Sequence, residues 1–248
     1  MELIELKNLF DAEFPSGAVT NTEKVRWFNN ACLDMVRKTL CLKSYALWSI
    51  VADQRGYTKA EMGATNYLMV DPEEGIVWQK SVDDDGNRDW VRLEATTTDW
   101  LDKNVGEGWR DDDNTGDPTR YFWYADPDEG QKLGFNPIPD TAVSTGDGFK
   151  MVYIPKPNVL EDDANEPFSL NAGLEPYHEL IVTYALWKAK QKRGKFTQAR
   201  EYRTEYKGST REDSPYYGGI ALMKQEIKQN PDFRPHLRID EDYFKWHI

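Results

Sequence analysis

The sequence predicts an α+β fold: an antiparallel helical bundle from both chain ends, with an inserted antiparallel β-rich domain and an extended C-terminal tail. Helical spacing of apolar residues near both ends, short β-type runs between them, and a final stretch rich in proline and aromatic residues predict this arrangement. Neither helical zone can bury its apolar face alone, so we expect the two to pack together. The expected parts are an N-terminal helical part of the bundle (1–44), the β-rich inserted domain (45–170), a C-terminal helical hairpin of the bundle (171–212) and a C-terminal extension (213–248).

The N-terminal helix is predicted over residues 21–42. Thr20 and Glu23 have the spacing of a capping box, in which each side chain accepts a hydrogen bond from the other residue's backbone N–H. Apolar residues then recur at steps of three and four: Val25, Phe28, Cys32, Val36 and Leu40. A shorter helix is expected before Pro15. Cys32 and Cys41 lie about 13.5 Å apart along one helix, so we expect two reduced core thiols and no disulfide.

The middle of the chain is predicted to form antiparallel strands. Seven short β-type runs occur between turn signals: Tyr45–Val51, Asn66–Val70, Ile76–Val82, Trp90–Leu93, Arg120–Tyr124, Lys132–Phe135 and Phe149–Ile154. The sequences at 71–75 and 83–87 each contain three acidic residues and a Gly, so each is expected to join two strands as a hairpin turn. A short capped helix is expected from Thr97 to Val105.

The third zone is predicted to be helical again. Pro176 suits the first turn of a helix that ends at Gly194, and a second helix ends at Gly208. A short amphipathic piece from Ile220 to Ile227 leads into the tail.

The composition limits the possible functions. Aromatic residues make up 13% of the 248 residues, which favours oligomerisation because such side chains are enriched at protein interfaces. The net charge of −12 argues against wrapping nucleic acid in a basic groove but is compatible with DNA sliding past an acidic wall. No signal peptide and no apolar run near 18 residues is visible, so we expect a soluble intracellular product without a membrane span.

A series of motifs between residues 116 and 207 resembles a known family. The stretch Gly116-Asp117-Pro118-Thr119-Arg120-Tyr121 leads into a strand. It is followed by Leu133-Gly134-Phe135-Asn136-Pro137-Ile138-Pro139, by Met151-Val152-Tyr153-Ile154-Pro155, and by the helix start Tyr177-His178-Glu179-Leu180-Ile181. In order and spacing this series resembles the head-to-tail adaptor, or connector, proteins of tailed bacteriophages. Residues 45–115 and the tail have no counterpart in this resemblance.

The resemblance implies a structural protein of the virion, made in the host cytoplasm and located at the head–tail junction. Such adaptors form a ring, commonly a dodecamer of twelve copies, beneath the portal protein. The ring extends the DNA channel, through which DNA passes without sequence-specific binding, and it provides the platform for tail or nozzle proteins. The C-terminal segment often docks on the portal, while the β region faces the tail. No membrane contact is implied.

Two sets of residues are candidates for these contacts. The tail either folds back on its own domain or docks on the portal, and the resemblance favours docking through its apolar anchors Phe233, Leu237, Ile239, Tyr243, Phe244 and Trp246. The helical hairpin carries a basic strip that is expected to be either an ordinary solvated face or an inter-subunit contact with an acidic neighbour, and less readily a DNA contact: Lys188, Lys192, Arg193, Arg200 and Arg203. Acidic residues concentrate between 71 and 130, so neighbouring copies can meet with complementary charge.

The sequence predicts no enzyme, no cofactor and no metal site. Residues 111–116 begin like a calcium loop, but the twelfth position, which needs Glu, is Phe122. No acid, base and nucleophile converge, and no Cys/His cluster has zinc spacing. The alternative function is a carbohydrate-binding or tail-fibre module with exposed stacking platforms, followed by a glycosidase using paired carboxylates. The platforms of that alternative would be Trp78, Trp90, Trp100, Trp109 and Trp123.

Overall fold

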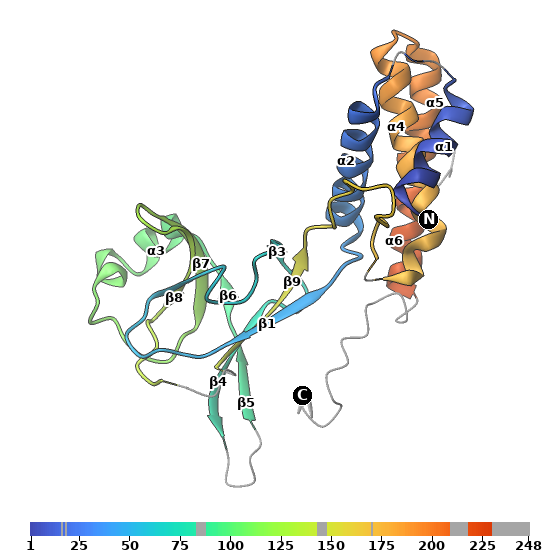
Figure 1. The fold of residues 1–248 in the computed structure, drawn as a ribbon. Helices are drawn as coiled ribbons and strands as arrows, with labels where there is room; N and C mark the ends of the chain where they lie inside the picture. Colours follow the sequence, from blue (N-terminus) through green and yellow to red (C-terminus); the bar gives the residue numbers. More distant parts are fainter. Residues whose placement is uncertain are drawn as a thin grey trace. The chain divides into compact units, whose positions relative to one another are not determined.

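The fold is α+β, and the chain divides into two units, a helical unit and a β unit (Figure 1). A computed structural model describes the chain up to residue 229, apart from residues 16, 18, 83–87, 143–147, 170 and 209–217. The helical unit comprises Met1–Lys43 and the described residues from Lys156 onward, and the β unit is Ser44–Pro155.

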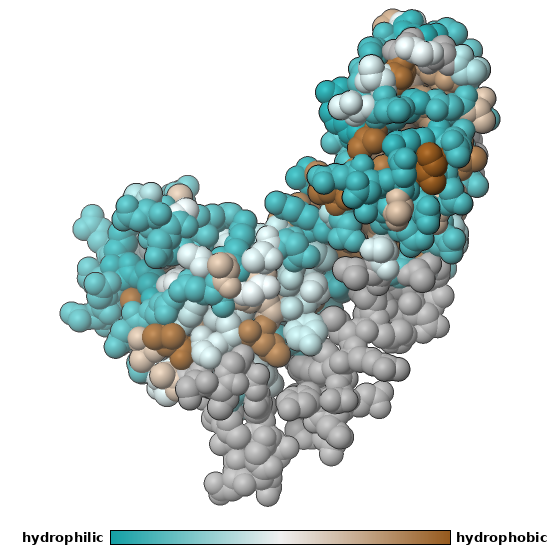
Figure 2. Space-filling model, in the orientation of Figure 1, coloured by the Kyte–Doolittle hydropathy of each residue, from teal (hydrophilic) through white to brown (hydrophobic). Residues whose placement is uncertain are grey.

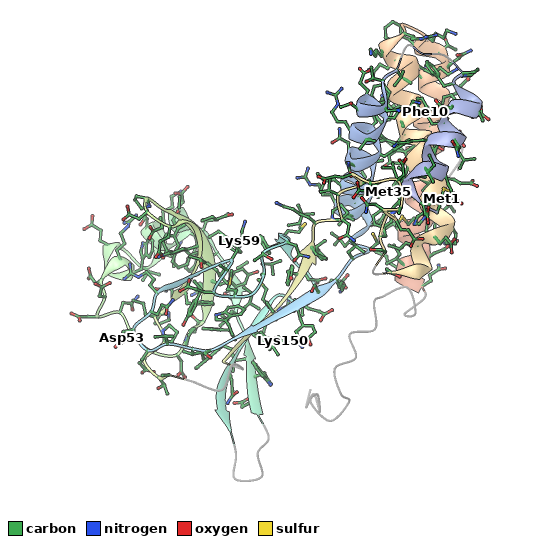
Figure 3. The ribbon with its side chains drawn as sticks, viewed as in Figure 1. Met1, Phe10, Met35, Asp53, Lys59 and Lys150 are labelled. Atoms are coloured by element: carbon green, nitrogen blue, oxygen red, sulfur yellow. The ribbon has the colours of Figure 1, made fainter. Side chains whose placement is uncertain are left out.

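Six elements make up the helical unit, and helices from both ends of the chain pack together in it (Figure 1). Helix α4 contacts α1, α2 and α5, while α6 contacts α2 and α5. Phe10 and Met35, on α1 and α2, are fully buried in this core (Figure 3). None of the helices in the described part of the chain is long and apolar enough to cross a membrane. The elements are α1 (Leu3–Glu13), α2 (Asn21–Thr39), the 3-10 helix η2 (Ala172–Tyr177), α4 (His178–Lys192), α5 (Phe196–Lys207) and α6 (Gly219–Gln229).

Local signals define helix α2. The predicted capping box is present: Glu23 N donates to Thr20 Oγ1 over 3.2 Å, and Thr20 N donates to Glu23 Oε2 over 3.1 Å. The helix ends at Thr39, three residues earlier than predicted, because Leu40 adopts a left-handed conformation with φ of 55°. Cys41 therefore lies outside the helix that contains Cys32, contrary to the single helical stretch expected for both.

Both cysteines are free and buried. Burial raises the pKa of the Cys32 thiol to about 12 and that of Cys41 to about 11. Because the thiolate is the reactive form, both side chains act as small apolar core residues at neutral pH.

The segment that follows the β unit is fastened to the two N-terminal helices. The Asn29 side chain donates to Leu160 O over 3.1 Å and accepts from Leu160 N over 2.8 Å, and Leu3 N donates to Asn165 O over 2.9 Å. Leu160 and Phe168 are buried in the same unit. Residues 156–169 therefore complete the helical unit.

Among the residues that the structure describes, the β unit contains nine strands in two sheets. One sheet has the order β1-β9-β4-β5 with β3 also paired to β9, and the other has the order β2-β8-β7-β6. All seven predicted strands are present with ends shifted by up to three residues, whereas the very short β2 and β6 are additions. The elements are β1 (Ser44–Trp48), β2 (Gly56–Thr58), β3 (Tyr67–Val70), β4 (Ile76–Val82), β5 (Arg88–Arg92), β6 (Glu94–Ala95), α3 (Thr98–Asn104), the 3-10 helix η1 (Glu107–Arg110), β7 (Arg120–Asp126), β8 (Gly130–Asn136) and β9 (Phe149–Pro155).

Aromatic rings form the centre of the β unit, where the two sheets meet. Phe149 of β9 stacks on Phe135 of β8 with ring centroids 4.1 Å apart, and Trp48 and Tyr57 pack on the same ring at 5.3 and 5.9 Å. All four side chains are at most 4% exposed. Much of the aromatic excess in the sequence is therefore used inside this unit and does not by itself require a partner surface.

The turn at residues 71–75 does not form the expected hairpin. Strands β3 and β4 both run antiparallel to β9, so they point in the same direction along it. Asp71 N donates to Val152 O over 2.9 Å, and Val152 N donates to Gly75 O over 3.0 Å. Residues 71–75 therefore loop out from the edge of β9, between the part that pairs with β3 and the part that pairs with β4. The Asp71 carboxylate accepts from Glu73 N and Glu74 N and thereby stabilises the loop. The second predicted turn, 83–87, lies outside the described residues, although its flanking strands β4 and β5 are paired.

Candidate interaction site

The structure divides the predicted basic strip on α4 and α5 into separate groups. Lys188 and Arg203 converge on the indole ring of Trp187, with charge centres 4.1 and 5.8 Å from the ring centroid. Helices α4 and α5 lie along each other, which brings these two positions together. Arg200 is exposed on α5 and does not take part in this convergence.

Lys192 and Arg193 serve the helical unit itself. Lys192 Nζ lies 2.6 Å from Glu23 Oε1 and links the end of α4 to the start of α2. Its hydrogen bond to Glu23 is the main cause that lowers the pKa of that carboxyl group. The Arg193 guanidinium lies 4.9 Å from the ring centroid of Phe14. These two side chains are therefore engaged within one chain.

A third cation joins the ring of Trp187. Lys207 Nζ, from the last turn of α5, lies 5.2 Å from the ring centroid. We call Trp187, Lys188, Arg203 and Lys207 the Trp187 cluster. The indole is half-buried, and Tyr184 packs edge-on against it at 5.3 Å. Sequence reasoning did not single out Trp187, although a tryptophan preceding a run of basic residues was a visible signal.

The Trp187 cluster has an excess of positive charge. Within the described parts of the chain, none of its three cations forms an ion pair with a carboxylate. Partial burial, followed by the charges of Lys38 and Arg203, lowers the pKa of Lys207. The acidic side chain that Lys207 senses is Asp34, but Asp34 already pairs with Lys38 and accepts a 2.9 Å hydrogen bond from the Tyr206 hydroxyl.

A buried aromatic layer supports the cluster from inside. Tyr206 is fully buried and its ring packs on Tyr184 at 5.2 Å, while Lys38 Nζ lies 5.5 Å from the Tyr206 ring centroid. Burial and the neighbouring Asp34 carboxylate raise the pKa of Tyr206, so its hydroxyl remains a hydrogen-bond donor. The cations of the cluster are thus held on a rigid aromatic base.

The opposite charge lies in the β unit. Acidic residues outnumber Lys and Arg by twelve between residues 44 and 155 and balance them elsewhere, so the whole net charge of −12 belongs to this unit. Asp111, Asp112 and Asp113 follow η1 and are exposed, and the Asp112 side chain is fully so. Figure 2 shows a predominantly hydrophilic surface around α3 and β7.

The loop that carries these aspartates is fixed by hydrogen bonds to the end of β8. Gly116 N donates to Ile138 O over 2.8 Å, and Ile138 N donates to Asn114 O over 2.9 Å. Arg55 donates to Asp111 O over 2.8 Å. Among the residues that the structure describes, no group of three or more His, Cys, Asp or Glu side chains could hold a metal ion.

Two of the five tryptophans proposed as exposed platforms for the carbohydrate-binding alternative are buried, and the other three are only partly exposed. Trp78 and Trp109 are each only 6% exposed, and the Trp109 indole donates to Asp102 over 2.7 Å. Trp123 packs on Tyr67 at 4.9 Å. Trp90 is half-buried, and the partly exposed Trp100 carries the Arg120 guanidinium 4.3 Å above its ring. The prediction of five exposed platforms was wrong because most of these rings belong to the packing of the β unit.

The predicted docking anchors of the tail, from Phe233 to Trp246, lie outside the described residues.

The model of a protein family described as SU10 adaptor protein matches residues 1–218. The match includes the whole β unit and helices α1, α2, α4 and α5 of the helical unit. No curated protein matches the chain.

Proposed function

The chain belongs to the SU10 adaptor protein family, and from this premise we propose that identical copies close into a ring beneath the portal of the phage particle. Membership of this family makes the chain a structural adaptor of the virion, as its resemblance to head-to-tail adaptors predicted. In the proposal the ring has twelve copies, extends the DNA channel and offers the platform on which tail or nozzle proteins assemble. The chain carries out no catalysis.

The observation that carries the proposal is the extent of the family match. It covers residues 1–218, which include the whole β unit and every element of the helical unit except α6, so the adaptor assignment applies to both units and not to one shared module. The contacts of α4 with α1, α2 and α5 support the finer fold description, an antiparallel bundle from both chain ends. The C-terminal extension then remains for docking on the portal.

The charge distribution supports a channel that does not retain DNA. The net charge of −12 repels a polyanion, and tight DNA binding depends on neutralising several phosphates with Lys or Arg. Lys192, one of the cations of the helical unit, is paired with Glu23 within the chain. The proposal therefore includes passage of DNA without sequence-specific binding.

Negative-stain imaging of the full chain with its portal tests the proposal. We expect closed rings stacked on one face of the portal. Deleting residues 231–248 removes none of the described elements, which end at Gln229, and should abolish portal binding while leaving the thermal melting temperature unchanged. A full chain that does not bind portal would contradict the adaptor role, whereas unchanged binding by the truncated chain would contradict only the docking role of the tail.

A further inference from the structure

We propose that the Trp187 cluster of one copy binds the acidic segment Asp111–Asp113 of a second copy. The inference rests on the ring in the proposed function and names the surfaces that would join neighbouring subunits. The contact is made by one defined cluster instead of the broad basic strip: Trp187, Lys188, Arg203 and Lys207. Its partner is the acidic segment of a second copy.

Within the described residues, no carboxylate pairs with the cations of the Trp187 cluster, so its positive charge is not compensated. Lys188, Arg203 and Lys207 surround one indole ring at 4.1, 5.8 and 5.2 Å from its centroid. Like charges at such spacing repel one another. Asp34 is the described carboxylate with the strongest electrostatic effect on the cluster, but it already pairs with Lys38 and accepts a hydrogen bond from Tyr206. The dipoles at the C-terminal ends of α2 and α5 offset part of the repulsion. An anionic partner would offset the rest.

Contacts with aromatic rings make the Trp187 cluster rigid. The ring attracts each cation through its negative face, which limits the motion of long side chains that are otherwise mobile. Tyr184 packs edge-on against the indole and in turn packs on the buried Tyr206. A partner that binds there meets charges already in place, so less conformational entropy is lost on association.

The charge distribution favours carboxylates of a second copy over the phosphates of DNA as the partner of the cluster. All of the net charge of −12 lies between residues 44 and 155, so each copy that offers a Trp187 cluster also offers an acidic β unit. The same charge repels DNA from the molecule as a whole. In a ring of identical chains, every cluster then has a partner of opposite sign at equal concentration.

Within the β unit, residues 111–113 are three consecutive exposed aspartates. Two other acidic side chains of this unit are already engaged: Asp102 binds Arg110 and the Trp109 indole, and Asp126 accepts from two backbone N–H groups and binds Lys132. The Asp112 carboxylate is fully exposed and pairs with Arg55 over 3.4 Å, whereas Asp111 and Asp113 form no ion pair among the described residues. The backbone hydrogen bonds of Asn114 and Gly116 to Ile138 hold the backbone of the loop that carries these three residues.

The two surfaces differ from each other, which is what a ring requires. An interface between a surface on the helical unit and another on the β unit is heterologous, because each copy uses one patch toward one neighbour and the other patch toward the next. Complementary charge on such patches favours one register of association over others.

Charge reversal on each surface tests the pairing in the full chain. We expect Arg203→Glu with Lys207→Glu, or Asp111→Lys with Asp113→Lys, to lower the self-association constant about 10- to 100-fold at low ionic strength. Sedimentation velocity measures the association, and thermal melting confirms that each variant is folded. Combining the four substitutions in one chain recreates opposite charges and should restore association to within about threefold of the wild type.

Two matched controls accompany the test. Lys195→Glu with Arg200→Glu makes the same charge change on the same hairpin, but away from Trp187, and should leave association nearly unchanged. Glu212→Gln with Asp213→Asn removes the two acidic residues of the same chain that follow Lys207 in sequence. If acidic residues of another copy neutralise the cluster, this change should not weaken association.

Several outcomes would overturn the inference. The first is a wild-type chain that stays monomeric at every attainable concentration at low salt. The second is that the variants of Arg203 and Lys207 associate as well as the Lys195 and Arg200 control. The third is that the chain with all four substitutions does not regain association. If the cluster variants no longer bound double-stranded DNA but associated as the wild type does, the Trp187 cluster would be a DNA contact instead. Rings beneath the portal that form equally well from the cluster variant would refute this pairing while leaving the proposed function intact.

Discussion

Replacing Phe149 by Ala should strongly destabilise the β unit. The side chain is fully buried, stacks on Phe135 with centroids 4.1 Å apart and an interplanar angle of 8°, and contacts the rings of Trp48 and Tyr57. Truncation removes the ring and leaves a cavity between two sheets that cannot easily collapse, so we expect a loss of about 3–5 kcal/mol in the free energy of unfolding. Phe149→Leu keeps much of the apolar volume and should cost roughly 1–2 kcal/mol.

Urea denaturation followed by tryptophan fluorescence measures this loss, because Trp48 lies in the affected core. Phe196→Ala provides the matched control, since it makes the same chemical change at a side chain that is 69% exposed, and it should change the free energy of unfolding by less than about 0.5 kcal/mol. If the Phe149 and Phe196 variants lost equal stability, or if Phe149→Ala lost less than about 1 kcal/mol, the account of the aromatic core would be wrong.

Three further predictions concern the helical unit. Tyr206→Phe removes a buried hydroxyl that donates to Asp34, and it should lower the free energy of unfolding by about 1 kcal/mol in urea denaturation. No loss would show that this hydrogen bond does not contribute to stability. Burial lowers the pKa of His178 below its usual value, so the folded state binds a proton less readily than the unfolded state does. The contribution of His178 to stability should therefore be complete above about pH 6.5 and fall as the pH drops below that value. His178→Gln should flatten the dependence of the free energy of unfolding on pH between about pH 7.5 and 5.5, and an unchanged slope would contradict this. Cys32 and Cys41 should not react with a thiol reagent at pH 8 until the protein unfolds, and rapid labelling of the native chain would contradict their burial.

Signals that lie close together in sequence predicted local structure well. The capping pair Thr20 and Glu23 and the apolar spacing after it located α2, because both depend on residues within one or two helical turns. Thr97 likewise caps α3 by accepting a hydrogen bond from Trp100 N. The seven predicted strands were found for the same reason, since alternation and flanking turn residues are local properties.

Features that depend on distant partners could not be predicted. The loop at 71–75 is a typical hairpin turn by composition, but its flanking strands both pair with β9, which begins at Phe149. Strands β2 and β6 have three and two residues, too few for a periodic signal. They exist because β8 and β7 supply their hydrogen-bond partners.

The candidate site was predictable only in outline. Spacing placed the basic residues on one helical hairpin, but it could not show that Lys192 binds Glu23 of another helix or that Lys207 turns toward Trp187. These arrangements depend on how α2, α4 and α5 pack. The five tryptophans of the carbohydrate alternative illustrate the same limit, because composition cannot distinguish an exposed ring from a buried one such as Trp78.

The central claim is that this chain is a structural adaptor that forms a ring at the head–tail junction. A cryo-electron microscopy reconstruction of that junction in the intact particle tests it most directly. We predict a closed ring of this chain directly beneath the portal, with copies related by twelve-fold symmetry and both units resolved in each. The chain located instead in a tail fibre, or missing from particles that are otherwise complete, would contradict the account.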